Sequence, residues 1–484
     1  MDLGRTVATG PGGRPAVSSN VLFEDYAGSQ ACEPCHEEIV RRFADSPMHR
    51  MTRDAEHTDV QGPFDGGRLR IGDDVATMRT VDGRRYLHLR SEERGNRLYR
   101  VTHVIGGRYR EDYVGIRVAG TGARDRPLAE PPTRLILPVS WIRSDREWRY
   151  KGYSVQVPER PGMKAGPEWN RTCIFCHNTV PYLSLVLDDL GDHDVGYQGS
   201  TTSNLLPEDR RLRYEVRDPD GLSSALVDEI ERLGGEARRW RSADFLLRQA
   251  TYATKDRFRG RHLVELGIGC ESCHGGARQH VETPSKLPSY RPRSSLFTVE
   301  AERGELGRAG AINHTCARCH SVLFSRYPYT WEGGTRDRHP RGSTINSGEA
   351  RNFLLGGCAR AMTCTTCHDP HGEDDPEHLE RLATPAGNAT CTQCHESLAG
   401  EEALRRHSHH DPGGAGGSCV ACHMPRKNAG LDYALTRYHR IGSPTDAERV
   451  EGDRPLECAL CHQGKSVEEL VTTMERWWGA DYDR

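Results

Sequence analysis

The stretch GIGCESCHGGARQH, residues 267–280, carries the pattern that decides the fold: two cysteines three positions apart, followed at once by a histidine. This C-x-x-C-H pattern occurs eight times in the 484 residues and accounts for 16 of the 17 cysteines. In chain order, the eight copies are Cys32, Cys35 and His36; Cys173, Cys176 and His177; Cys270, Cys273 and His274; Cys316, Cys319 and His320; Cys364, Cys367 and His368; Cys391, Cys394 and His395; Cys419, Cys422 and His423; and Cys458, Cys461 and His462. So many copies indicate one chemical group bound many times. We number the motifs 1 to 8 in this order.

The spacing of the motif fits covalent attachment of haem c. Two thiols three positions apart can add to the two vinyl groups on one side of a porphyrin, and the adjacent histidine can bind the iron. Zinc sites do not need a histidine after every second cysteine, and a disulfide framework has no use for one. We therefore expect eight covalent haems, each attached through both cysteines of its motif and with its motif histidine as the proximal iron ligand.

Composition supports this interpretation. Hydrophobic residues make up only 35% of the chain and the mean hydropathy is −0.72, so haem would have to fill part of the interior. Charge is nearly balanced, with 66 Lys and Arg against 69 Asp and Glu, which argues against nucleic acid as a partner. No apolar run approaches the roughly 18 residues of a membrane span.

The motifs are unevenly spread along the chain. The expected parts are a disordered arm (1–20), an N-terminal part with haems 1 and 2 (21–180), a loop with a helical insert (181–266), a haem-rich domain with haems 3 to 8 (267–466) and a C-terminal helix (467–484). Polar and apolar residues alternate at period two in 64–156, which predicts an antiparallel sheet. The predicted fold class is therefore mostly irregular and helical around stacked haems, with a small β insert.

Each iron needs a sixth ligand unless it binds substrate, and 15 histidines remain outside the motifs. Those whose context favours distal ligation are His49, His103, His280, His314, His371, His407, His410 and His439. His280 and His371 closely follow their own motifs, so a neighbouring iron is easier for them to reach. His409, His262 and His339 are reserves, whereas His57, His88, His193 and His378 are interpreted as surface residues.

Three methionines and one cysteine have simpler interpretations. Met48, Met51 and Met424 lie near motifs, but core filling is favoured for all three, and Met424 adjoins a proximal histidine. The odd thiol, Cys358, is interpreted as a small buried residue, with a redox or cross-linking role as the alternative.

The compartment follows from the chemistry of the cofactor. Thiol-linked haem is assembled outside the cytoplasm in bacteria, so we expect a periplasmic or extracellular protein. Residues 1–20 have no apolar core and do not read as a secretory signal. A signal would then lie upstream of this start, or the chain has been trimmed.

Several motif-bearing stretches resemble multihaem cytochromes related to the tetrahaem electron acceptor of hydroxylamine oxidoreductase. They are SQACEPCHEEIVRRFADSPMHRM (29–51), GIGCESCHGGARQH (267–280), MTCTTCHDPHG (362–372), GNATCTQCH (387–395), GGSCVACHMP (416–425) and CALCHQGKSVEEL (458–470). The resemblance implies that His49, His280 and His371 are distal ligands. In that family, such cytochrome modules are often fused to helical repeats. The long insert at 185–262 is a departure of this chain from the family pattern.

Three functions remain open at this point. Electron transfer along mostly bis-histidine haems, between redox partners that the sequence does not name, is favoured. A multihaem reductase or oxidase of a nitrogen or sulfur oxyanion would need one haem with an open distal side. A filament subunit that stacks haems between copies of the chain would require self-association.

Overall fold

The structure, a computed structural model, describes residues 14–151, 162–191, 195, 206, 210–301, 304, 306–321, 348–372, 374–429, 434–447, 450 and 456–479. All eight motifs are described, whereas His193 and His339 lie outside these ranges. The chain forms two compact units, one of residues 1–201 and 213–299 and the other of 202–212 and 300–484. Motifs 1 to 3 belong to the first unit and motifs 4 to 8 to the second.

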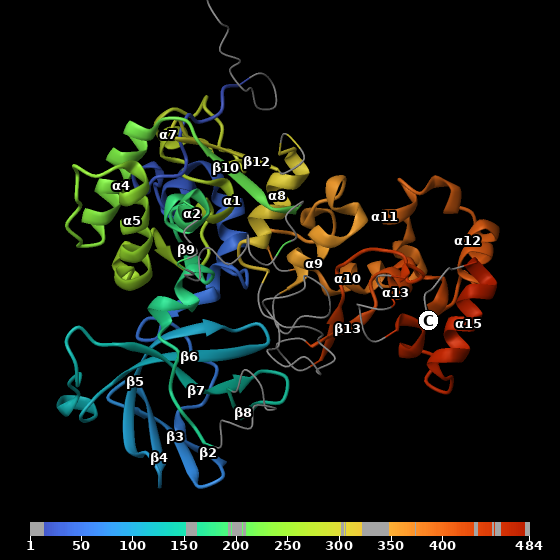
Figure 1. Cartoon of the computed structure of the whole chain (residues 1–484). Coiled ribbons are helices and arrows are strands. Elements are labelled where there is room, and N and C mark those ends of the chain that lie inside the picture. The colour runs from blue at the N-terminus through green and yellow to red at the C-terminus, as the bar shows by residue number, and fades with distance from the viewer. Residues whose placement is uncertain are drawn as a thin grey trace, which may run out of the picture. The chain divides into compact units, whose positions relative to one another are not determined.

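An antiparallel sheet of eight strands dominates part of the first unit (Figure 1). The strands are β1 (Thr52–Asp54), β2 (Asp65–Ile71), β3 (Asp74–Val81), β4 (Arg84–Ser91), β5 (Gly95–Gly106), β6 (Arg110–Arg117), β7 (Arg134–Ile142) and β8 (Glu147–Tyr150). Strands β2 to β8 follow one another in chain order, and β1 pairs with β5. Asp82 (φ 49°) and Gly83 (φ 74°) form the tight β3–β4 turn, since positive φ at both central residues suits a hairpin.

The predicted fold class was wrong about this sheet. It is a large structure with a side-chain core of its own, including Met78, Leu87 and Leu89, all fully buried, and not a small insert. Short hairpin connections add most of the strands to the same sheet, so individually modest patterns sum to one large element. Composition averaged over the whole chain concealed this locally apolar region.

The sheet buries both of its faces. Strand β6 is buried along most of its length. On one side Tyr113 belongs to the core of the sheet, and on the other Val114 packs with Ile136, Ile174 and residues around motif 2. The second face of the sheet therefore supports motif 2.

Helices and short strands complete the first unit. They are α1 (Glu33–Ala44), β9 (Asn178–Thr179), α2 (Tyr182–Gly191), β10 (Leu212–Val216), α4 (Pro219–Arg232), α5 (Ala243–Arg257), β11 (Glu265–Leu266), α6 (Glu271–His274), α7 (Arg278–Glu282) and β12 (Phe297–Ala301). Asp218 and Ser242 cap the N-termini of α4 and α5. Leu187, Leu226 and Leu246 join α2, α4 and α5 into one apolar core.

The second unit consists of short helices joined by turns. They are α8 (Arg308–Ala317), α9 (Glu349–Leu355), α10 (Pro376–Leu382), α11 (Ala389–Thr392), α12 (Glu401–Ser408), α13 (Cys419–His423) and α15 (Val467–Trp478), with the hairpin β13 (Arg426–Ala429) and β14 (Leu435–Arg437). Its clusters of buried apolar side chains are small, such as Leu456 with Leu470 and Met474. Among the described residues, no helix combines the length and apolarity needed to cross a membrane.

Candidate haem-binding sites

Each motif is folded into a helical turn. In six motifs the backbone N–H of the histidine donates to the carbonyl of the first cysteine, at 2.9–3.1 Å, and the remaining motifs lie in α1 and α13. One turn brings residues three and four apart to the same face. Both thiols and the imidazole of a motif therefore point to one side, and all the cysteines are free thiols.

The second cysteine of each motif differs in exposure from site to site. Three of these thiols belong to exposed residues, namely Cys35, Cys394 and Cys461. The other five belong to half-buried residues, namely Cys176, Cys273, Cys319, Cys367 and Cys422. Each one keeps a side that a porphyrin could reach, but covalent attachment of haem at these eight cysteines stays a prediction.

The cysteines do not form a site for a bare metal ion. In the described part of the chain, no three or more His, Cys, Asp and Glu side chains are grouped so that they could hold one. The thiols of haem c bond to carbon atoms of the porphyrin, so Cys35, Cys176 and the other second cysteines need not converge on a metal. The iron needs imidazoles instead, and their positions are the geometry that matters here.

Four proximal imidazoles face a second imidazole, and each partner is one of the distal ligands expected from the sequence. The ring centroids lie 6.2 Å apart for His36 and His280, 6.3 Å for His368 and His439, 6.1 Å for His407 and His423, and 6.0 Å for His410 and His462. The interplanar angles range from 6° to 39°.

These separations match the space that one metal ion needs between two imidazoles. A metal–imidazole bond is about 2.0 Å long and the coordinating nitrogen lies about 1.1 Å from the ring centroid, so two ligands in line place their centroids about 6.2 Å apart. The residues present therefore fit haem iron at motifs 1, 5, 7 and 8.

Hydrogen bonds orient several of these rings. The Nδ1 atoms of His280, His439, His423 and His410 lie 2.5–2.9 Å from the backbone carbonyls of Lys286, Arg437, Gly442 and Ser408, respectively. A carbonyl only accepts, so each Nδ1 carries the proton and donates it. The lone pair is then on Nε2, the nitrogen that would bind iron.

Contacts between cysteines show which motifs are neighbours. The side chain of Cys32 lies beside that of Cys270, Cys316 lies beside Cys364, and Cys391 lies beside Cys419. Each of these thiols is the first cysteine of its motif. The contacts join motif 1 to motif 3, motif 4 to motif 5 and motif 6 to motif 7.

A buried carboxylate holds motifs 1 and 3 together, although they are far apart in sequence. Glu271, inside motif 3, accepts the backbone N–H groups of Ala27, Gly28 and Ala277 at 2.7–2.8 Å. Burial raises the pKa of Glu271, and these three donors counteract that rise. The segment that leads into motif 1 is thereby fixed to motif 3.

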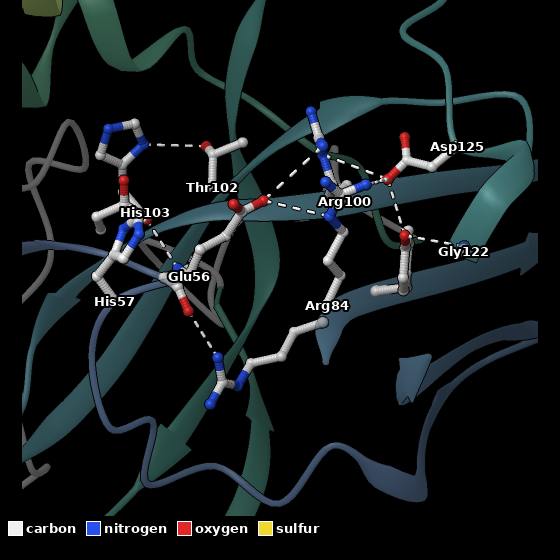
Figure 2. Close-up of polar contacts among 12 residues, drawn as sticks. Glu56, His57, Arg84, Arg100, Thr102, His103, Gly122 and Asp125 are labelled. Atoms are coloured by element: carbon white, nitrogen blue, oxygen red, sulfur yellow. Dashed lines mark hydrogen bonds and ion pairs between the residues drawn. The ribbon is translucent and has the colours of Figure 1, made fainter. Parts of the chain in front are cut away.

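His103, another expected ligand, lies on β5 beside motif 2. Its ring stacks on Trp169, with centroids 4.8 Å apart, and Nδ1 lies 3.0 Å from the Thr102 hydroxyl (Figure 2). Burial and the nearby Arg134 lower the pKa of His103 to about 4, so the imidazole is neutral at pH 7. Below it, Glu56 and Asp125 pair with Arg84 and Arg100.

His49, His314 and His371 are not shown opposite a proximal imidazole. The backbone around His49 lies between motifs 2 and 3, because Met48 accepts from Ile268 and Thr52 donates to the carbonyl of His177. His314 lies in α8 just before motif 4, and burial lowers its pKa to about 4. For His371 the structure gives a backbone N–H donation to Asp369.

Among the reserves, His262 has the wrong tautomer for an iron ligand. Its Nδ1 accepts the backbone N–H of Arg259 at 3.0 Å, which places the proton on Nε2. A protonated nitrogen has no lone pair for a metal. The reserve His409 stacks on Trp477, with centroids 4.6 Å apart.

The four pairs above do not include the proximal histidines His177, His274, His320 and His395. The ring of Tyr290 lies 4.9 Å from that of His274, which is contact distance. Burial lowers the pKa of His320. The carboxylate of Glu349, 3.6 Å away, has the larger effect and raises the pKa of His320 to about 9. Glu349 carries no sequence signal, because it lies 29 positions after its partner.

Known proteins with similar sequences bind haem c through the same motif. Residues 357–400 match the family model of the doubled CXXCH motif, which covers motifs 5 and 6. The chain is thus similar to multihaem c-type cytochromes. It is 24% identical over 194 residues to the dissimilatory sulfite reductase MccA of Wolinella succinogenes, and 24% identical over 153 residues to the multihaem cytochrome MtrA of Shewanella baltica.

The matches to these relatives are partial. The matched stretches span 34% and 28% of this chain, and 23% and 44% of the relatives' own lengths. A solved structure, that of the outer cell wall cytochrome OcwA, aligns with 94% of this chain and 87% of its own, at 15% identity and a TM-score of 0.42.

Proposed function

We propose that this cytochrome carries electrons between redox partners outside the cytoplasm, with eight covalent haems bound at its eight motifs. Bound haem c supplies a one-electron carrier at each site. The observation that supports the proposal most directly is the set of four imidazole pairs. An iron held between two histidines has no free position for a substrate. Kinship with the tetrahaem electron acceptor of hydroxylamine oxidoreductase is part of the same proposal.

Neighbouring motifs support a path within the second unit. Cysteine contacts join motif 4 to motif 5 and motif 6 to motif 7. His407 and His410, three residues apart, face the proximal histidines of motifs 7 and 8. One short segment would therefore hold two adjacent irons. We infer that electrons pass along these sites in sequence.

The first unit carries a shorter series. Cys32 and Cys270 join motifs 1 and 3. Motifs 2 and 3 are joined by β9 and β11, whose register pairs Glu265 with Thr179 and Leu266 with Asn178. The Ser272 hydroxyl, inside motif 3, also lies 3.1 Å from that of Thr179 and donates to it.

Spectroscopy tests this function. We expect the intact protein to weigh about eight haem masses more than the polypeptide, and its ferric irons at motifs 1, 5, 7 and 8 to be low-spin by electron paramagnetic resonance. The reduced protein should bind little carbon monoxide. Six or fewer haems would refute the octahaem count, and high-spin iron at those four motifs would refute the carrier proposal.

A second candidate, oxyanion reduction, is favoured by the surroundings of motif 2. Three donors there, Nε of Arg134, Nε1 of Trp169 and Nε2 of His262, are buried without a hydrogen-bond partner. Buried donors normally have acceptors, and the oxygens of an anion would supply them. The relative MccA is named a sulfite reductase. Turnover of sulfite or nitrite, lost in Trp169→Phe, would favour this candidate, and no turnover would exclude it for those substrates.

A further inference from the structure

The axial imidazole of motif 5 contacts a carboxylate through its second nitrogen. Nδ1 of His368, the proximal histidine of motif 5, lies 2.8 Å from Oδ2 of Asp374. In the pairs of motifs 1, 7 and 8, the Nδ1 contacts described go to backbone carbonyls. Glu349 approaches His320 only to 3.6 Å, beyond hydrogen-bond distance.

The loop that follows motif 5 fixes this carboxylate in place. Oδ1 of Asp374 accepts the backbone N–H of Asp369 at 2.9 Å, so both carboxylate oxygens are engaged. The next residue, Asp375, caps helix α10 by accepting the N–H of Glu377. The Asp374 side chain is only 14% exposed, and this limits screening of its charge by water.

The opposite ligand of the same site has an ordinary environment. His439 faces His368 at 6.3 Å and donates from Nδ1 to the carbonyl of Arg437 at 2.9 Å. The carboxylate is thus the feature that distinguishes this site. A carboxylate that accepts from Nδ1–H makes the imidazole a stronger electron donor to a metal on Nε2.

We propose that Asp374 sets the reduction potential of the motif 5 haem, and lowers it through His368. A stronger donor and a nearby negative charge both stabilise ferric iron relative to ferrous iron. Electrons that pass along the haems would then reach one of low reduction potential at motif 5. This inference rests on the proposed bis-histidine ligation by His368 and His439.

The test compares two neighbouring carboxylates in the full holoprotein. Asp374→Asn keeps an acceptor for His368 but removes the charge, and Asp375→Asn removes the same charge one residue away while leaving a good helix cap. A redox titration followed by electron paramagnetic resonance reports the reduction potentials of the haems. In Asp374→Asn, one haem component should have a higher reduction potential than in the wild type. The expected shift is about tenfold in the one-electron equilibrium, which equals about 59 mV.

Each outcome supports or overturns the proposal. An unshifted component in Asp374→Asn, or an equal shift in Asp375→Asn, overturns it. Asp374→Glu keeps the charge and should retain most of the wild-type reduction potential. It serves as the second variant if Asp374→Asn fails to incorporate haem. An upward shift in Asp374→Glu equal to that in Asp374→Asn would also overturn the proposal. His439→Ala separates the ligation hypothesis from the role of Asp374. If this variant gives no new high-spin iron, ligation by His439 is refuted. If it gives a new high-spin iron but Asp374→Asn leaves every reduction potential unshifted, only the role of Asp374 is refuted.

Discussion

The histidines of the four imidazole pairs illustrate how far residue-scale reasoning extends. His280, His407, His410 and His439 were expected as ligands from their positions near motifs, and the structure places each opposite a proximal imidazole. The sequence did not indicate which iron each would serve. That assignment depends on long-range contacts, such as that of Glu271 with Ala27, which have no local pattern.

Removing one distal imidazole should open one iron. We expect His280→Ala to convert the iron at His36 from low-spin to high-spin and to let it bind carbon monoxide when reduced, because the axial ligand is a strong determinant of iron behaviour. His378→Ala, which removes a half-buried histidine that contacts Arg381, is the control. Electron paramagnetic resonance and optical titration measure the change. If His280→Ala leaves every iron low-spin, the assignment of His280 is wrong.

A buried ion pair beside motif 8 predicts a stability effect. Lys427 Nζ donates to Glu457 Oε1 at 3.0 Å, and both side chains are at most 2% exposed. Lys427→Met removes the cation of this pair, and breaking a buried ion pair by removing one partner costs about 3–5 kcal/mol. Chemical denaturation followed by circular dichroism measures the loss. Arg406→Met, which breaks an exposed pair with Glu402, should cost at most about 1 kcal/mol, and equal losses in the two variants would contradict the prediction.

At the scale of elements, helix α15 positions the segment that carries two distal ligands. Trp478 Nε1 donates to the carbonyl of His407 at 2.7 Å, and Trp477 stacks on His409. The backbone of His409 has φ 54°, a left-handed conformation that is uncommon for residues other than glycine. The helix therefore holds a strained turn between His407 and His410.

Trp478→Phe removes that hydrogen bond and keeps the aromatic packing. We expect a loss of about 1 kcal/mol in the free energy of unfolding, with altered low-spin signals from the irons at His423 and His462. Trp240→Phe is the matched control, because Trp240 is 77% exposed. Thermal unfolding and electron paramagnetic resonance report the two effects. Unchanged signals in Trp478→Phe would show that α15 does not support these ligands.

The elements also show why sequence reasoning failed where it did. Period-two alternation predicts strands in the stretch where β2 to β8 lie, because alternation is a local property. The size of the sheet depends on pairings such as β1 with β5, which join Thr52 to Ile105 across an intervening series of hairpins. Asp374 was missed for a similar reason, since nothing in the order of residues shows that a loop turns back onto His368.

At the scale of the whole molecule, the two units hold different kinds of interior. The sheet of the first unit encloses buried side chains such as Met78 and Leu137. The second unit carries five motifs, and its described apolar clusters are small. We therefore expect bound haem to supply much of the free energy of folding there, as a structural metal does in small metal-binding domains.

This difference predicts unequal behaviour when haem is withheld. In protein expressed without the haem-attachment machinery, we expect protease to cleave residues 348–479 rapidly while residues 52–150 persist as a protected fragment, because the sheet has a large side-chain core whereas the described apolar clusters of residues 348–479 are small. The holoprotein, treated identically, should resist cleavage in both regions. Mass spectrometry of the fragments and hydrogen exchange measure the protection. An apoprotein protected equally throughout would show that side chains alone stabilise the second unit, and loss of the sheet fragment would show that its core depends on the neighbouring haems.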